Sequence, residues 1–177
     1  MDQVTAVILA AGEGKRMRSR QPKVLHPLCG RPLIAFPLRT ARTLADRIAL
    51  VVGPNAEEVV AVAGADVRSV VQKERLGSGH AVQQARAECG EGTILVLPGD
   101  MPLLSVETIG RLVEHHRKSR AAATVLTAVV PAPHGYGRVI RQRGRVKKIV
   151  EERDATAAEK KVAEINTPVY CFTAARL

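Results

Sequence analysis

The segment that decides the fold is LAAGEGKRMRSRQPK (Leu9–Lys23), in which two glycines and five basic residues directly follow an apolar run. A strand that ends in glycine and positive charge predicts a phosphate-binding loop. Two familiar loops do not fit the spacing. A Walker A loop needs glycine in place of Leu9 and Ser or Thr in place of Arg16, and the dinucleotide fingerprint needs glycine in place of Met17. The loop therefore belongs to neither group.

The composition predicts one globular domain in a reducing compartment. The chain has 177 residues, of which 46% are hydrophobic and 2% aromatic, so we expect a core of aliphatic side chains. No apolar run is long enough to cross a membrane, and the N-terminus lacks the pattern of a secretory signal. Three widely spaced cysteines form no zinc pattern and are typical of reduced thiols. We expect a cytoplasmic protein that binds no membrane.

The net charge of +10 indicates an anionic partner, whether a nucleotide, a phosphorylated sugar or a nucleic acid. Much of the charge lies in residues 15–23 and 138–148, where most of the side chains are interpreted as solvated surface. Nucleic acid is the least favoured partner, because the four aromatic residues are scattered and form no stacking platform. We therefore expect small-molecule anions, and no nucleic acid, as partners.

Continuous apolar runs alternate with helical patterns along most of the chain. Because the runs are not interleaved with polar residues, they are typical of strands buried on both faces. The alternation predicts an α/β fold with a doubly wound, mostly parallel sheet and helices on both faces, Rossmann-like in class. The expected strands are Thr5–Ala11, Arg47–Val52, Asp66–Val71, Thr93–Leu97 and Ala123–Val130.

Local signals place the helices between these strands. The helix that contains Pro37 is expected to be interrupted or restarted there. Asn55 with Glu58 has the spacing of a capped start for a second helix, and a third helix is expected over Ser78–Glu88. Ser105 predicts the start of a fourth helix.

The last third of the chain predicts a small C-terminal β-hairpin region. Arg138–Arg141 and Val146–Val150 flank four residues with the character of a turn. Thr156 and Glu159 have the spacing of a capping box for one short helical turn. Val169–Phe172 is expected to form a final strand.

The unusual residues of the chain follow successive strands, so we expect them to meet at the sheet edge where open α/β folds bind ligands. Gly12 would let backbone N–H groups approach a phosphate, and Gln72 offers both a donor and an acceptor to a pyrimidine base. Asp100 is a hard oxygen ligand of the kind that Mg²⁺ prefers. Structural interpretations stay open, since Gly12 suits a tight turn and Asp100 suits an Asx-turn.

The histidines are interpreted as structural or surface residues. His115 and His116 are adjacent, so on a helix they do not share a face, and His80 stands alone. No set of nucleophile, base and orienting residue is present in the sequence. That pattern fits a phosphoryl-type transfer, in which positioning and charge stabilisation do most of the work.

Six ordered segments resemble the sugar-phosphate nucleotidyltransferase family. They are LAAGEGKRM…QPKVLHPLCGRPLI, QKERLGSGHAVQQA, LPGDMPLLSVETI, GYGRVIR, IVEERDAT and EINTPVY. Within that family they are similar to the uridylyltransferase domains of bacterial bifunctional N-acetylglucosamine-1-phosphate uridylyltransferase/glucosamine-1-phosphate acetyltransferases. The resemblance runs from about Val4 to Phe172.

The resemblance implies UTP and N-acetylglucosamine 1-phosphate as substrates, Mg²⁺ as cofactor, and UDP-N-acetylglucosamine and pyrophosphate as products. It implies that Arg16 and Lys23 stabilise charge during transfer and that Asp100 holds the metal. The implied nucleotide-binding residues are Leu9, Ala10, Ala11, Gly12, Gln72, Gly77, Ser78 and Gly99. The implied sugar-binding residues are Gly137, Glu151 and Asn166.

The length of the chain departs from the family. Its uridylyltransferase domain continues past this length, includes a second protein ligand for Mg²⁺, and is followed by a hexapeptide-repeat acetyltransferase domain. We therefore expect residues 1–177 to be a single nucleotidyltransferase domain, truncated at its C-terminus and monomeric. Two alternatives stay open: a nucleotidyltransferase for another sugar phosphate or a cofactor precursor, and a fragment that binds nucleotide or sugar nucleotide without turnover.

Overall fold

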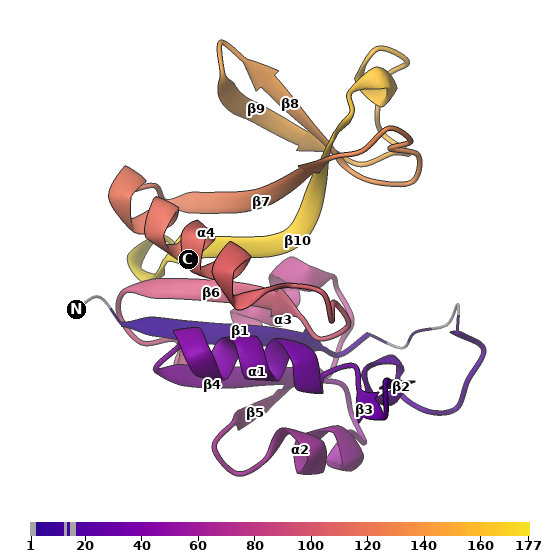
Figure 1. The fold of residues 1–177 in the computed structure, drawn as a ribbon, viewed down its shortest axis with the longest axis vertical. Helices are drawn as coiled ribbons and strands as arrows, with labels where there is room; N and C mark the ends of the chain where they lie inside the picture. The colour runs from indigo at the N-terminus through magenta and orange to yellow at the C-terminus, as the bar shows by residue number, and fades with distance from the viewer. Residues whose placement is uncertain (1–2, 13, 15–16) are drawn as a thin grey trace. The chain divides into compact units, whose positions relative to one another are not determined.

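The apolar run before the glycine loop forms β1 (Val4–Ala10), the central strand of the larger of two structural units (Figure 1). The structure is a computed structural model that describes residues 3–12, 14 and 17–177. Unit 1 comprises the described residues of Met1–Thr124 together with Tyr170–Leu177, and unit 2 comprises Val125–Val169.

The sheet of unit 1 is mostly parallel, as the continuous apolar runs predict. Strands β4 (Arg47–Val52) and β6 (Thr93–Pro98) pair in parallel with the two edges of β1, and β5 (Arg68–Val71) pairs in parallel with β4. The last residues of β10 (Glu164–Thr173) pair antiparallel with β6. Every residue of β6 is buried, which is the environment that a strand without polar alternation requires.

Helices cover both faces of this sheet, which confirms the doubly wound α/β class (Figure 1). Helices α1 (Ala35–Leu44) and α4 (Val106–Ser119) pack together on one face, and α3 (Ser78–Gln84) covers the other. Val7 of β1 packs in a core cluster with Ala81 of α3. Burial of one such aliphatic side chain contributes about 1.5–3 kcal/mol.

Short elements complete unit 1. Helix α2 (Glu57–Ala63) follows β4. The others are β2 (Pro27–Leu28), which pairs with β3 (Arg31–Pro32), and 3-10 helices at Lys23–Leu25, Arg86–Glu88 and Ala174–Arg176. Within the described part of the chain, none of the helices has the length and apolar character needed to cross a membrane.

The predicted helix starts have different outcomes. Ser105 caps α4 as expected, because its Oγ accepts a hydrogen bond from the N–H of Thr108 at 3.1 Å. Pro37 does not interrupt α1, because it lies in the first turn, where a backbone N–H has no helical acceptor. Asn55 does not cap α2. It adopts the left-handed backbone that Asn tolerates, with φ of 58°, and Ala56 is the N-cap instead.

Unit 2 contains the predicted hairpin, formed by β8 (Arg138–Gln142) and β9 (Arg145–Val150). Its turn residues Arg143 and Gly144 have φ of 50° and 77°, the positive values of a type I′ turn. Strand β10 pairs with β8 and also with β7 (Ala123–Val129).

A capping box in unit 2 holds a strongly acidic carboxyl group at the start of the 3-10 helix Glu159–Lys161. Thr156 N–H donates to Glu159 Oε2 at 2.9 Å, and Lys148 Nζ lies 2.6 Å from Glu159 Oε1. These contacts, chiefly the one with Lys148, lower the pKa of Glu159 from 4.5 to about 2. Because the folded-state pKa is the lower one, the carboxylate stabilises the fold above pH 4.5 and loses that contribution as the pH falls towards 2.

We expect a carboxyl NMR titration to find Glu159 still ionised at about pH 3. In Lys148→Gln the titration midpoint should rise towards 4.5, because the hydrogen-bonded cation is removed. Lys147→Gln, a change of the neighbouring exposed cation, is the matched control and should leave the midpoint unchanged. A midpoint that stays low in Lys148→Gln would show that the capping box alone sets the pKa.

Candidate functional site

A pocket of about 310 Å³ lies where β1 and β5 end in unit 1. Six of its eight lining residues are those that the sequence implies for nucleotide binding. The lining residues are Leu9, Ala11, Gly12, Gln72, Arg75, Gly77, Ser78 and Ala81. Residues far apart in the sequence therefore meet at one edge of the sheet, where open α/β sheets bind ligands.

Gln72 is held in this pocket by two contacts of its side-chain nitrogen. The residue is buried, and its Nε2 donates to Gly77 O at 3.2 Å and lies 3.0 Å from His80 Nδ1. The hydrogen bond to Gly77 O fixes the orientation of the amide, and the carbonyl oxygen of a glutamine side chain can accept a hydrogen bond from a ligand. His80 acts here as a structural partner of Gln72. Gly77 has φ of 101°, a value that side-chain-bearing residues rarely adopt, so glycine is needed there.

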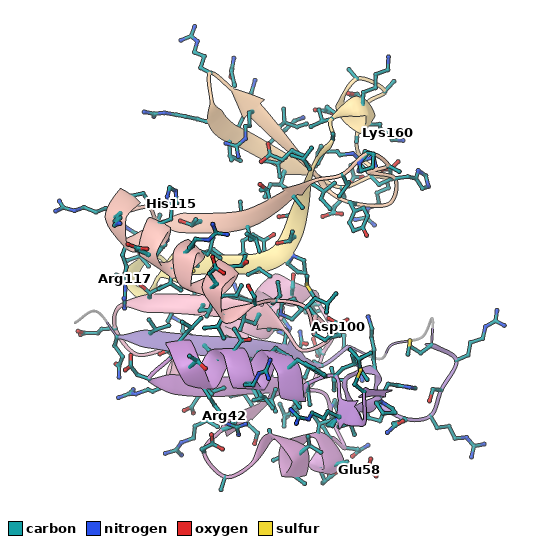
Figure 2. All side chains as sticks on the ribbon, in the orientation of Figure 1. Arg42, Glu58, Asp100, His115, Arg117 and Lys160 are labelled. Atoms are coloured by element: carbon teal, nitrogen blue, oxygen red, sulfur yellow. The ribbon has the colours of Figure 1, made fainter. Side chains whose placement is uncertain are left out.

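Gly99 brings Asp100 to the end of β1. Its N–H donates to Leu9 O at 2.9 Å, and a Cβ at Gly99 would lie 3.0 Å from that oxygen and 3.2 Å from Val24 Cγ1. Glycine permits this close approach of two backbones. The next residue, Asp100, forms an ion pair with Lys23. Figure 2 shows Asp100 at the carboxyl end of the sheet of unit 1.

Lys23 is placed by the backbone as well as by its charge. It begins the 3-10 helix Lys23–Leu25, and a Cβ at Gly14 would lie 2.7 Å from Lys23 Cβ. The glycine loop can therefore pass Lys23 only because Gly14 has no side chain. The ion pair with Asp100 puts a cation and a carboxylate together at the sheet edge. The lysine cation is suited to bind phosphate oxygens, and the aspartate carboxylate is suited to bind a hard divalent metal.

Asp100 fits Mg²⁺ as a single protein ligand. Over residues 3–12, 14 and 17–177, no group of three or more His, Cys, Asp or Glu side chains could hold a metal ion by itself. Mg²⁺ commonly takes one or two carboxylates and completes its shell with water and substrate phosphates. One carboxylate beside a phosphate-binding edge suits a metal that binds together with a nucleotide.

Arg75 lines the pocket, although it is not among the residues expected there from the sequence. It also lines a second cavity of about 160 Å³, which includes Ala10 and Gly53. Its Nε donates to Ala11 O at 3.1 Å, so the guanidinium is fixed against the end of β1. Its place in the segment QKERLGSG, next to the glycines of the pocket, was the available sequence signal.

Arg75→Gln is expected to weaken the binding of a nucleoside triphosphate, with UTP as the probe, by roughly tenfold and to leave the binding of the nucleoside uridine unchanged, because a guanidinium acts mainly on phosphate charge. Calorimetry with each ligand measures both dissociation constants. Arg68→Gln on β5, also a change of an exposed arginine, is the matched control and should alter neither constant. Equal losses for UTP and uridine would show instead that Arg75 only supports the pocket wall through Ala11.

Unit 2 brings together the three residues implied for sugar binding. Asn166 N–H donates to Gly137 O at 2.9 Å. A Cβ at Gly137 would lie 3.2 Å from Glu151 Oε1, so the Glu151 carboxylate lies against the backbone of Gly137, which has no side chain. The three residues lie next to the start of β8, next to the end of β9, and on β10.

The remaining predicted residues have separate outcomes. Arg16 lies outside the described residues. Gly99 lines neither of the two cavities described above, and it supports the approach of Asp100 instead. His116 is buried with Nδ1 2.8 Å from Thr124 Oγ1, and His115 is exposed, so both fit the structural or surface interpretation.

Comparison with known proteins finds a matching family and relatives that are longer than this chain. Residues 6–164 match the family described as MobA-like NTP transferase domain. The chain is 50% identical over 177 residues to the bifunctional protein GlmU of Syntrophotalea carbinolica, with 98% of this chain and 38% of that protein covered. It is 47% identical over 176 residues to the bifunctional protein GlmU of Brevibacillus brevis, with 97% and 38% covered. The chain thus spans 38% of the length of these two relatives.

Two solved structures share the fold. A putative glucose-1-phosphate thymidylyltransferase from Bacillus anthracis, in complex with a sucrose, matches with a TM-score of 0.84 and 21% identity over 97% of this chain and 72% of that one. A UDP-glucose pyrophosphorylase complexed with UDP-glucose matches with a TM-score of 0.81 and 18% identity over 98% of this chain and 76% of that one. At these identities the likeness concerns the fold alone.

Proposed function

The chain belongs to the family of MobA-like NTP transferase domains, and from that membership we propose that it transfers UMP from UTP to N-acetylglucosamine 1-phosphate. The products are UDP-N-acetylglucosamine and pyrophosphate. The observation that carries the proposal is the pocket in unit 1, six of whose lining residues are among those that the family resemblance implies for nucleotide binding. The identities of 50% and 47% to two bifunctional GlmU proteins add support.

The pocket of unit 1 receives the nucleotide. The carbonyl oxygen of Gln72 accepts a hydrogen bond from the ring N–H of uracil, while its amide nitrogen donates to Gly77 O. Gly12 is exposed and a Cβ there would meet nothing within 4 Å, so a phosphate group has room to approach its backbone. Arg75 adds positive charge at the wall of the pocket.

Transfer then depends on Lys23 and Asp100. A phosphate oxygen of the sugar phosphate bonds to the α-phosphorus of UTP, and the bond from that phosphorus to the β-phosphate oxygen breaks, so pyrophosphate leaves with the electron pair. Lys23 stabilises the negative charge on the triphosphate, as Arg16 does in this proposal. Asp100 holds Mg²⁺, which when bound neutralises phosphate charge. Positioning and charge, with no covalent enzyme intermediate, account for the reaction.

Unit 2 provides the residues for the sugar. Gly137, Glu151 and Asn166 lie together and offer a carboxylate and amide groups to the hydroxyl and acetamido groups of N-acetylglucosamine. We take the two units to work as one nucleotidyltransferase domain, because one contains the residues for the nucleotide and the other the residues for the sugar. The free thiols of the three cysteines favour the reducing cytoplasm as its location.

The test is to incubate the chain with UTP, N-acetylglucosamine 1-phosphate and Mg²⁺ and to measure pyrophosphate. We expect pyrophosphate release to stop when excess EDTA is added. It should fall when glucose 1-phosphate replaces N-acetylglucosamine 1-phosphate or when CTP replaces UTP. Absence of both pyrophosphate and UTP binding would contradict the proposal. UTP binding without pyrophosphate would leave a nucleotide-binding protein and refute the transfer, and a stronger response to another sugar phosphate would reassign the acceptor.

A further inference from the structure

Arg138 is a charged side chain in the interior of unit 2. It is 1% exposed and is the largest fully buried side chain among the described residues. A buried guanidinium is unfavourable unless it is paired and hydrogen-bonded. Its Nε has no hydrogen-bond partner among the described residues, which adds to that penalty. Stability alone therefore gives a poor reason for an arginine at this position.

The contacts of Arg138 join three separate segments of unit 2. Its Nη1 donates to Tyr136 O, and its Nη2 donates to Glu152 Oε2 at 2.6 Å and to Lys160 O at 3.4 Å. Glu152 Oε2 also accepts from Gly135 N–H at 3.2 Å. The guanidinium holds the pKa of Glu152 below its usual range, so the pair stays ionised at neutral pH.

Each residue proposed to bind the sugar is adjacent to this network. Gly137 precedes Arg138 in the chain, and Glu151 precedes Glu152. Asn166 follows Ile165, the residue opposite Arg138 in the pairing of β8 with β10. Gly137 O in turn accepts from Asn166 N–H. A change in the ion pair would therefore shift the backbone beside all three residues.

We propose that the Arg138–Glu152 ion pair is a positioning pair, which fixes the residues for the sugar and so sets the affinity for the sugar moiety without touching it. The inference rests on the proposed function for the identity of the sugar. A buried and hydrogen-bonded ion pair is sensitive to geometry, so it holds its neighbours in one arrangement, whereas apolar side chains tolerate several. Small displacements of binding groups are costly in affinity and rate.

The same unit offers a matched control. Arg141 Nε and Nη2 each lie 2.7 Å from an oxygen of Glu164, so this is a second Arg–Glu pair of unit 2, bidentate and between β8 and β10, whereas Arg138 contacts Glu152 through Nη2 alone. Arg141 is 44% exposed, against 1% for Arg138. Exposed pairs of this kind contribute little. The two pairs therefore share their chemistry and have their arginines on the same strand, β8, and they differ in burial and in their distance along the chain from the sugar residues.

The experiment compares Arg138→Lys and Glu152→Gln with Arg141→Lys and Glu164→Gln in the full chain. Calorimetry well below the melting temperature gives Kd for UDP and for UDP-N-acetylglucosamine. The Kd for UDP divided by the Kd for UDP-N-acetylglucosamine reports the contribution of the sugar to binding, whether or not the chain turns over. We expect the first two variants to reduce the ratio by about tenfold, because the sugar residues lose their arrangement, with Kd for UDP unchanged. The controls should keep the wild-type ratio.

The experiment distinguishes failure of this inference from failure of the proposed function. If the first two variants melt at a lower temperature but keep the wild-type ratio, the pair is only structural and the inference is wrong. If the wild-type protein itself binds UDP and UDP-N-acetylglucosamine equally, the proposed sugar specificity fails instead. Glu152→Gln has the shape of the native side chain, so it tests the pair even where Arg138→Lys does not fold.

Discussion

Asp100→Asn is expected to reduce Mg²⁺-dependent release of pyrophosphate by about 100-fold or more, because it removes the carboxylate charge at the point where phosphate charge must be neutralised. Asparagine keeps the shape of the side chain and can still accept a hydrogen bond from Lys23. The loss therefore reflects charge rather than collapse of the sheet edge. The same variant should need more Mg²⁺ for half-maximal rate, since an amide oxygen is a weaker ligand than a carboxylate.

The measurement is the initial rate of pyrophosphate release across a titration of Mg²⁺. Asp66→Asn is the matched control, because Asp66 also pairs with a basic side chain in unit 1, at 2.8 Å from Arg42 Nε, and lines neither cavity. Figure 2 shows its partner Arg42 away from Asp100. We expect the control to keep wild-type rates. Retained activity in Asp100→Asn would remove Asp100 from the metal site and leave its pairing with Lys23 as its role.

The inner strands β1, β4 and β6 were predictable because burial on both faces leaves a strong signal, whereas the expected burial on both faces was wrong for β5, which is largely exposed at the edge of the sheet, and for β7. β4 was expected over Arg47–Val52 and forms over those residues, and β6 differs from its expected range by one residue. Helix starts were less predictable, since a cap depends on one backbone conformation. Ser105 has the extended backbone of an N-cap, whereas Asn55 has a left-handed one, and the sequence does not distinguish the two.

The residues of the candidate site likewise include some that were predictable from the sequence and some that were not. The positions of Gly99 and Gln72 at strand ends were predictable, because a glycine or a polar residue is unusual directly after an apolar run. Arg75 and Arg138 were not predictable, because nothing in the sequence distinguishes them from the other arginines of a basic chain. The stretch 138–148 illustrates this: Arg143 and Arg145 are exposed as interpreted, and Arg138 in the same run is buried. Only tertiary packing separates them.

Lys23→Met is expected to lower kcat for pyrophosphate release by about 100-fold, because a cation fixed beside the triphosphate acts most strongly where charge develops in transfer. Methionine keeps most of the length of the lysine side chain, so the packing against Gly14 is retained. Lys23 is the ion-pair partner of Asp100. Removing that partner leaves the carboxylate more available to a divalent cation.

The consequence is a split between two readouts that separates charge stabilisation from a structural role. In Lys23→Met the rate should fall while the Mg²⁺ concentration for half-maximal rate stays equal or falls, the reverse of the shift expected in Asp100→Asn. Arg42→Met, which breaks the pair with Asp66, should change neither quantity. If the half-maximal Mg²⁺ concentration rises together with the loss of rate, Lys23 acts by holding Asp100 in place. A retained kcat would assign the charge stabilisation to other groups of the glycine loop.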